Sequence, residues 1–375
     1  MNVSFGDGAL EVLHGLAFVA GIVVVGRTVM SAIRNFIMPR ADPLVLSRFV
    51  FVVVRHVFNV RVSRTKAYED RDRIMAIYAP ICLVMLAVTW VALVGAGCTA
   101  MFWAIGVHPL RDAAIASGSS LFTLGFIRPD GVPESLLAFT EAGFGLGLVA
   151  LLISYLPSIY AAFTRREIVV SMLEPLAGSP ATPTALLMRH HLVGGLDRLE
   201  DVWERWRVWF ADIEESHTSI SAIVFFRSPH PDESWVTAAG CILDSAALAT
   251  SCLDLPRSSN SAFCIRAGYV SLRRIATFFA IPYPADPEPT DPISVTRAEF
   301  DEVWSTLADR SVPLKRDQDQ AWREFAGWRV NYDEVLLRLC ALTMAPPARW
   351  SGDRAPKFVQ PPVWGRRRAR RALPG

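Results

Sequence analysis

Two long segments without a charged residue constrain this chain more than any other feature. Residues 74–106 are 33 consecutive uncharged positions, and residues 142–164 are 23 more. A helix needs about 20 predominantly apolar residues to cross the hydrocarbon core of a bilayer. Both segments are therefore predicted to be transmembrane helices, and the length of 375 residues leaves room for a soluble domain as well.

A third apolar segment lies near the N-terminus. Residues 10–26 carry one charge, Glu11, and are followed by Arg27. They lack the basic flank and the small-residue cleavage site of a signal peptide, so we expect an uncleaved first span. The fold class predicted from these three segments is an all-α membrane protein with three transmembrane helices.

The connection between the two charge-free segments is too short for a domain and too apolar for an ordinary loop. Its centre reads SGSSLFTLGF over residues 117–126. We expect residues 111–122 to form a short helix and residues 123–126 to be extended. Non-helical backbone is tolerated at membrane depth only where protein or a water-filled cavity surrounds it. The pattern therefore predicts a re-entrant pore helix and loop between two spans.

The loop also carries a resemblance. Thr123, Leu124, Gly125 and Phe126 resemble the Thr-Val-Gly-Tyr core of the potassium-channel selectivity filter, and Ser120 stands where that family often has an earlier threonine. The resemblance to the two-transmembrane, pore-loop potassium channels covers residues 74–167. It implies a homotetramer in which the carbonyls of residues 123–126 replace the hydration shell of K⁺ or another monovalent cation, with no other cofactor.

Two residues depart from the family pattern, and a third bears on the same region. Ile127 replaces the second filter glycine and disfavours the left-handed backbone that glycine permits. Arg128 replaces an acidic residue and places a positive charge near the outer mouth. Glu141 can hydrogen-bond the short helix, support the filter or pair with Arg128. Pore architecture is thus better supported than potassium selectivity.

The last span contains residues that loosen a helix. Glycines recur at every second position, and a proline removes a backbone hydrogen bond further along. In the resembled family such residues serve as gating hinges, whereas in membrane helices generally they serve packing. Both interpretations stay open for Gly143, Gly145, Gly147 and Pro157.

The distribution of basic residues predicts the orientation. Between Arg27 and Arg73 lie ten basic residues against four acidic ones, which places this connection in the cytoplasm. The N-terminus is then outside and the C-terminal domain cytoplasmic, in a cell membrane. The excess of arginine over lysine is typical of GC-rich coding DNA and suggests a bacterial source.

Residues 44–62, which carry three arginines, are expected to lie in the membrane interface rather than to span, as an anchor or a cuff around the pore.

The remaining chain divides into a helical cytoplasmic domain, residues 168–345, and a tail, residues 346–375. The preceding parts are residues 1–73, with the first span and the basic segment, and residues 74–167, the pore-like module. Residues 174–183 are expected to be a linker and residues 320–345 a single helix. Asp244 is expected to be a buried acid paired with an arginine such as Arg266.

An apolar stripe at helical spacing runs through residues 192–213. It predicts a helix packed within its own domain, with a coiled-coil seam between subunits as the alternative.

In the tail, residues 366–371 read RRRARR, which is typical of a solvated end or of contact with anionic lipid. We expect no nucleic-acid partner.

No motif indicates an enzyme. Ser216 and His217 suggest a nucleophile and its base, but no nucleophile elbow accompanies them, so we expect no catalytic residue. The six cysteines include no Cys-x-x-Cys pair and predict no metal site. The favoured function is an ion channel. The alternative is a non-conducting membrane scaffold or sensor that retains a pore-like fold.

Overall fold

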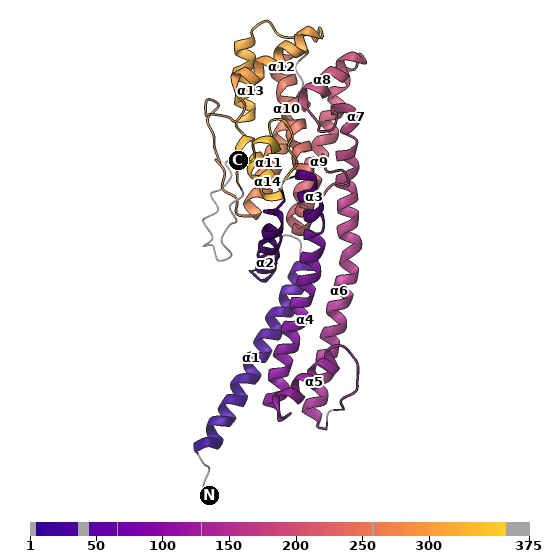
Figure 1. Cartoon of the computed structure of the whole chain (residues 1–375), viewed down its shortest axis with the longest axis vertical. Coiled ribbons are helices and arrows are strands. Elements are labelled where there is room, and N and C mark those ends of the chain that lie inside the picture. Colours follow the sequence, from indigo (N-terminus) through magenta and orange to yellow (C-terminus); the bar gives the residue numbers. More distant parts are fainter. Residues whose placement is uncertain (1–4, 37–44, 66, 129, 257–258, 358–375) are drawn as a thin grey trace. The chain divides into compact units, whose positions relative to one another are not determined.

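The computed structural model describes residues 5–36, 45–65, 67–128, 130–256 and 259–357, and its regular elements there are all helices (Figure 1). The only pairing of extended backbone in those ranges is one isolated bridge between Leu253 and Leu314. The predicted all-α class is confirmed. The chain divides into two compact units, one of Met1–Val54 with Pro80–Tyr160 and one of Arg55–Ala79 with Ala161–Gly375. The basic run at residues 366–371 lies outside the described residues.

Four helices are long and apolar enough to cross a membrane. Three belong to the segments predicted from the sequence: α1 (Phe5–Phe36), α4 (Tyr78–Ala104) and α6 (Val132–Ser171). Much of their apolar surface is exposed, as a lipid-facing helix requires. The fourth is α10 (Trp235–Cys252), of which 89% of the apolar window is buried inside the protein. Its apolar character is accounted for by packing in the second unit.

In the first unit, α1 and α4 approach each other closely at a pair of glycines. A Cβ atom on Gly21 would lie 2.5 Å from the carbonyl oxygen of Gly97, and one on Gly97 would lie 2.8 Å from a methyl group of Val25. Small residues at such crossings allow two backbones to touch, which strengthens van der Waals packing where the hydrophobic effect is absent. The same unit contains the short helix α5 (Leu110–Leu121).

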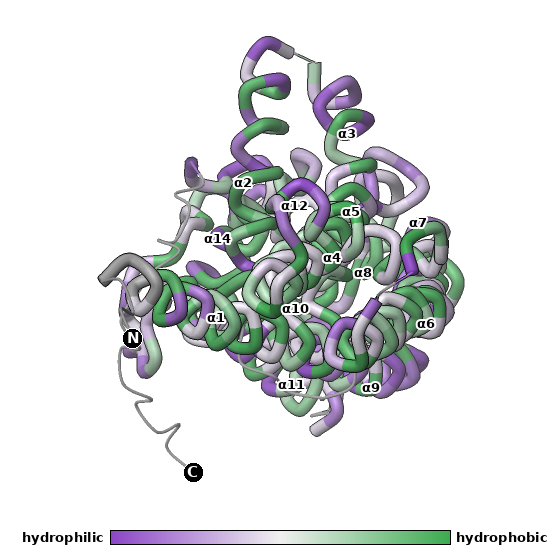
Figure 2. Tube along the Cα trace, turned by 90° about the horizontal axis from the view of Figure 1, so that it is seen from below, coloured by the Kyte–Doolittle hydropathy of each residue, from purple (hydrophilic) through white to green (hydrophobic). Residues whose placement is uncertain are grey.

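The second unit is a bundle around α10. Its other helices differ in hydropathy from α10: Figure 2 shows purple, hydrophilic stretches along α9 and α12. In chain order, the helices around α10 are α3 (Tyr68–Ala76), α7 (Glu174–Ala177), α8 (Pro183–Leu192), α9 (Leu199–Ser219), α11 (Ser259–Phe278), α12 (Arg297–Asp309), α13 (Gln318–Arg329) and α14 (Asp333–Thr343). Helix α2 (Val45–Val62) joins the two units along the chain.

The apolar stripe of α9 is buried in this bundle. Trp203, Trp206, Phe210 and Ile213 are all at most 2% exposed and belong to the same core cluster as α10 and α11. These residues therefore pack within their own domain, which is the first of the two interpretations of the stripe.

Two expectations about the helix boundaries of this unit were wrong. Residues 320–345 form two helices, because α13 ends at Arg329 and α14 begins at Asp333. The break leaves Tyr332 with a φ of −129° and its hydroxyl 2.9 Å from Asp244 Oδ1. Residues 174–183, expected to be a linker, include α7 and the start of α8.

Asp244 is buried and paired with an arginine, as expected, but the arginine is Arg329 rather than Arg266. Arg329 Nη1 donates to both Asp244 carboxylate oxygens at 2.5 Å, and its Nε donates to Asp333 Oδ1 at 2.7 Å. Its Nη2 donates to the carbonyl of Trp350 at 2.5 Å. Arg266 instead donates to the Tyr269 hydroxyl. Since the Arg329 side chain is fully buried, these bonds replace the water that it would otherwise bind.

A second set of polar contacts holds the connector between α1 and α4, residues 55–79, to this bundle. Arg227 Nη1 lies 3.2 Å from Asp72 Oδ1, 3.3 Å from the Tyr68 hydroxyl and 2.8 Å from the carbonyl oxygen of Met344. Arg55 Nη2 donates to the carbonyl of Leu342 at 3.2 Å. The end of α14 thus accepts two arginines, as a helix C-terminus favours.

Replacing Arg329 should destabilise the second unit strongly. An Arg329→Leu change leaves Asp244 buried without its counter-charge, which costs about 3–5 kcal/mol of unfolding free energy. The measurement is the urea midpoint in detergent, followed by tryptophan fluorescence. Arg338→Leu is the control, because its ion pair with Glu334 is about 40% exposed on both sides and contributes about 0.5 kcal/mol. Equal losses in the two variants would contradict the prediction.

Candidate functional site

Helix α5 lies between α4 and α6 in the first unit. Ala113 and Ala116, in the middle of α5, pack with Phe102 of α4 and Ala138 of α6 in one small apolar cluster. Phe102 is close to the C-terminal end of α4 and Ala138 is close to the start of α6. The first half of α5 therefore packs beside the connected ends of its two neighbours.

The other end of α5 touches glycines deeper in the same two helices. A Cβ atom on Gly145 of α6 would lie 2.1 Å from the carbonyl oxygen of Leu121, the last residue of α5. One on Gly95 of α4 would lie 3.2 Å from the Leu121 side chain. Only a residue without a side chain permits the first contact. Gly145 therefore sets how far α5 inserts between its neighbours.

The end of α5 is a closed C-terminal turn. Leu124 N–H donates to the carbonyl of Ser119 at 2.8 Å, and Thr123 N–H donates to that of Ser120 at 3.0 Å. This pair of bonds is a Schellman motif, with Thr123 at the left-handed position, φ +56°. Thr123 was expected to begin an extended stretch. Instead it terminates the helix in a conformation that a β-branched residue rarely adopts.

From the end of α5 onward, the apolar side chains of the loop are largely exposed. The side chains of Phe122, Leu124 and Phe126 are 61%, 64% and 64% exposed. Gly125 has φ +70°, and no heavy atom would lie within 4 Å of a Cβ built on it. Left-handed backbone thus occurs at Thr123 and again two residues later, but not at Ile127.

Ile127 and Arg128 have different surroundings. Ile127 is half-buried against the cluster of Phe102, Ala113 and their neighbours, and its N–H donates to Ser119 Oγ at 3.4 Å. Arg128 is exposed and forms no ion pair with any described residue. The β-branched residue at the position of the missing glycine therefore packs against protein, and the positive charge faces outward.

Glu141 is fully buried and contacts α5 rather than Arg128. Its Oε1 lies 2.6 Å from the hydroxyl oxygen of Ser117, which is also 3.0 Å from the carbonyl oxygen of Gly95. Of the three roles considered for Glu141, hydrogen bonding to the short helix is the one observed among the described residues.

The other residues predicted for this region are spread along α5 and α6. The Ser120 hydroxyl donates to the carbonyl of Ala116 in its own helix and not to the loop. A Cβ atom on Gly143 or Gly147 would meet nothing within 4 Å. Pro157 lies inside α6, which is continuous from Val132 to Ser171. Of the three glycines, Gly145 alone is in close contact.

The sequence reasoning missed Gly95, Ser117 and Ser119. Ser117 and Ser119 link α5 to α4, to α6 and to the loop. The available signal was the group of three serines in SGSSLF, residues 117–122, set between two long apolar segments. Gly95 and Gly97 show the same spacing in α4 and contact α5 and α1 respectively.

An apolar cleft of about 590 Å³ lies along α4, α5 and α6. Exposed Val84, Val88 and Val149 form much of its rim, and Gly118 and Phe122 bring it to the end of α5. Apart from Thr99 and Ser117 its lining is almost entirely apolar, and such a surface fits an apolar environment or another protein surface.

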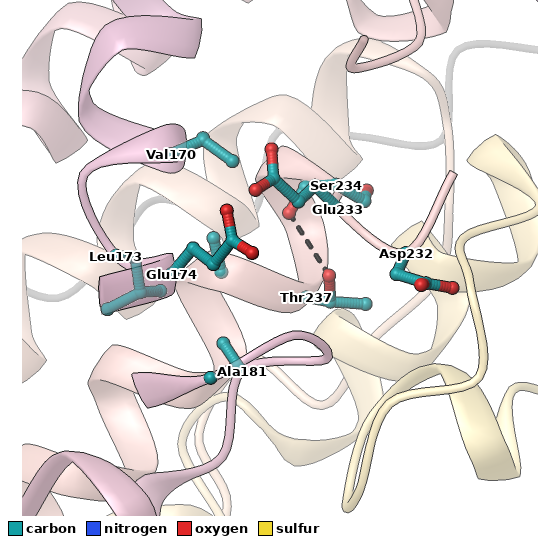
Figure 3. A pocket seen from close by; sticks show the side chains of 10 residues that line it. Val170, Leu173, Glu174, Ala181, Asp232, Glu233, Ser234 and Thr237 are labelled. Carbon is teal, nitrogen blue, oxygen red and sulfur yellow. Dashed lines mark hydrogen bonds between the residues drawn. The ribbon is translucent and has the colours of Figure 1, made fainter. Parts of the chain in front are cut away.

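The second unit has a small acidic pocket of about 20 Å³, enough for roughly one water molecule. Figure 3 shows the Glu174 and Glu233 carboxylates at this pocket, with Asp232 further away. Burial, together with the neighbouring carboxylates Glu174 and Glu167, raises the pKa of Glu233. No group of histidine, cysteine or acidic side chains in the described part of the chain has the arrangement of a metal site.

Ser216 and His217 are packed inside the second unit. Ser216 Oγ lies 3.1 Å from His217 Nδ1 but also donates to the carbonyl of Asp212 at 2.7 Å. Both side chains are at most 1% exposed, and the imidazole packs edge-on against Trp235. Burial and the nearby positive charge of Arg166 lower the pKa of His217 well below its usual value.

Comparison with known proteins places the chain in no group. No family model, curated protein or solved structure matches it.

Substitution of Gly145 should weaken the first unit. In Gly145→Ala the new methyl group overlaps the Leu121 carbonyl, so α5 must shift, at a cost of about 1–3 kcal/mol. The measurement is the thermal unfolding midpoint in detergent. Gly143→Ala, two residues away with no atom near the new methyl group, should be neutral or slightly stabilising because alanine favours helix. A result in which both variants behave alike would contradict this account.

Stability should fall in mild acid because of His217. The folded pKa is lowered, so below about pH 6.5 the unfolded chain binds a proton that the folded chain does not. The loss approaches about 1.4 kcal/mol per pH unit. We expect the urea midpoint of the wild type to decrease between pH 7 and pH 5 more steeply than that of His217→Gln. Parallel pH profiles would show that the histidine makes no such contribution.

Proposed function

We propose that this protein is a potassium-channel-like ion channel. Four copies surround a pore through which K⁺ or another monovalent cation passes passively. The conducting module is α4, α5, the loop at residues 122–128 and α6, with residues 123–126 nearest the axis. The second unit lies in the cytoplasm and regulates gating.

The depth of α5 supports a re-entrant helix. Gly145, which touches its last residue, is 13 residues after the start of α6, or about 20 Å along a helix. Gly95 is nine residues before the end of α4, or about 14 Å. If α4 and α6 cross the bilayer, the C-terminal end of α5 lies near the middle of the roughly 30 Å hydrocarbon core.

The single observation that carries the proposal is the open loop that follows α5. At that depth, exposed non-helical backbone is unfavourable unless protein or a water-filled cavity covers it. One chain leaves Phe122, Leu124, Gly125 and Phe126 exposed. Further copies meeting at this loop cover the side chains and leave the carbonyls facing a common, hydrated axis. One chain alone supplies one row of carbonyls, so conduction requires an oligomer.

The direction of α5 supports a cation rather than an anion. Its C-terminal end precedes the loop, and a helix C-terminus carries roughly half a negative charge. Four such ends around one axis attract a cation without an acidic side chain. Arg128 opposes this effect at the outer side, which favours weak selectivity.

Regulation by the second unit is supported by the connector. Residues 55–79 lead directly into α4 and are held to the bundle by Arg227 and Arg55. A rearrangement of the bundle that moves the end of α14 also moves the connector and the first residues of α4. Of the arginines in α2, Arg55 is buried and bound to the end of α14, so Arg48 and Arg61 are the two that face lipid headgroups from the cytoplasmic side in this arrangement.

Single-channel recording in planar bilayers tests the proposal. With potassium and sodium on opposite sides, we expect unitary currents from the wild type, and the reversal potential reports selectivity. Gly125→Ala should abolish or sharply reduce the conductance, because alanine is strained at φ +70°. Gly143→Ala should keep the unitary conductance, since a change in hinge flexibility alters open probability only.

Two results would count against conduction by this loop. Currents that are unchanged in Gly125→Ala would place the pore elsewhere. Silence from a purified tetramer, under conditions that open a bacterial channel gate, would favour a non-conducting scaffold or sensor. The outward-facing charge of Arg128 is the observation that favours that second function.

A further inference from the structure

The contact between α4, α5 and α6 at Ser117 has more acceptors than protons if Glu141 is ionised. Ser117 Oγ is 2.6 Å from Glu141 Oε1 and 3.0 Å from the carbonyl oxygen of Gly95. A hydroxyl has one proton to donate. If it donates to an ionised Glu141, the Gly95 carbonyl faces the Ser117 lone pairs at 3.0 Å with no hydrogen between them.

A neutral Glu141 removes this conflict. Its Oε1–H donates to Ser117 Oγ, and Ser117 then donates to the carbonyl of Gly95. Every oxygen in the chain from Glu141 to Gly95 has a suitable partner, and α6, α5 and α4 are joined by two consecutive hydrogen bonds. Oxygen–oxygen distances of 2.6 and 3.0 Å both suit O–H donors.

The surroundings of Glu141 also support a protonated, neutral carboxyl group. The residue is 0% exposed, and no cationic side chain among the described residues pairs with it. Its second oxygen, Oε2, accepts no hydrogen bond that satisfies normal geometry, although the Cys98 thiol of α4 lies beside the carboxyl group. A bare carbonyl oxygen is tolerable in an apolar environment, whereas a bare oxygen of an unpaired carboxylate is far more costly.

We propose that Glu141 is a neutral acid whose proton fastens the C-terminal half of α5 to α4 and α6. Glu141 is thus a positioning residue for the loop that begins at Phe122, five residues after Ser117. This clamp does not depend on conduction, but its effect on current rests on the proposed channel function.

Infrared difference spectroscopy tests the protonation state directly. Spectra of the purified full chain at pH 7 are compared between the wild type and Glu141→Gln. We expect the wild type to show the C=O stretch of one protonated carboxyl group per chain, which is lost in the variant. Loss of a carboxylate band instead would overturn the proposal.

Thermal unfolding tests the clamp independently. Glutamine can donate to Ser117 as the neutral acid does, so Glu141→Gln should keep the wild-type midpoint. Glu141→Ala and Ser117→Ala should each lower it by about 2–6 °C. Ser154→Ala is the matched control, because that exposed hydroxyl bonds only within α6. A Glu141→Gln midpoint as low as that of Glu141→Ala would mean that a negative charge is required and would overturn the proposal.

Recording from the same variants separates this inference from the channel hypothesis. If the wild type conducts, Glu141→Gln should retain its conductance and Ser117→Ala should reduce it. If the wild type is silent, the infrared and thermal results still decide whether Glu141 is neutral and whether it holds α5. Failure of conduction would therefore count against the channel and leave the clamp to be decided by those two measurements.

Discussion

The contact between the last carbonyl of α5 and the backbone of α6 at Gly145 determines the arrangement of the first unit. Because no side chain intervenes, α5 can insert until its end lies well inside the pair of longer helices. The burial of Glu141, the bond from Ser117 to α4 and the exposure of the loop are consequences of that depth. A bulkier residue at position 145 would displace all three together.

The second unit depends on a different kind of constraint. Its core contains a guanidinium group that is as buried as any leucine, and four acceptors on three other chain segments satisfy it. Such a network contributes little net free energy relative to an apolar core, yet losing one member is expensive. It also requires α10, α13 and the segment at Trp350 to adopt one relative placement. Desolvating the guanidinium and its carboxylate partners costs free energy, but it restricts the helices of this unit to a single packing arrangement.

The sequence predicted the parts of this fold that depend on local pattern. Charge-free length identified α4 and α6, and the short apolar connection between them identified α5 to within a residue at each end. What it did not predict depends on contacts distant in the chain. Arg329 is 85 residues from Asp244, and no periodicity connects them. Thr123 terminates α5 in a conformation usually given to glycine, so the local preference of threonine for extended backbone was misleading. The partner of Glu141 was predicted only as a helix, because the choice among its serines depends on rotation about the helix axis.

The bonds of the connector to the end of α14 have a consequence for biosynthesis. Tyr68 and its contact at Met344 are 276 residues apart. At a synthesis rate of about 5–20 residues per second, residue 344 is made roughly 14–55 s after residue 68. During that interval the apolar helices that precede the second unit can be inserted, while the end of α14, which accepts hydrogen bonds from Arg55 and Arg227, does not yet exist. The connector therefore takes its final place only after residue 344 has been synthesised, which makes this contact a late step relative to the insertion of the first helices.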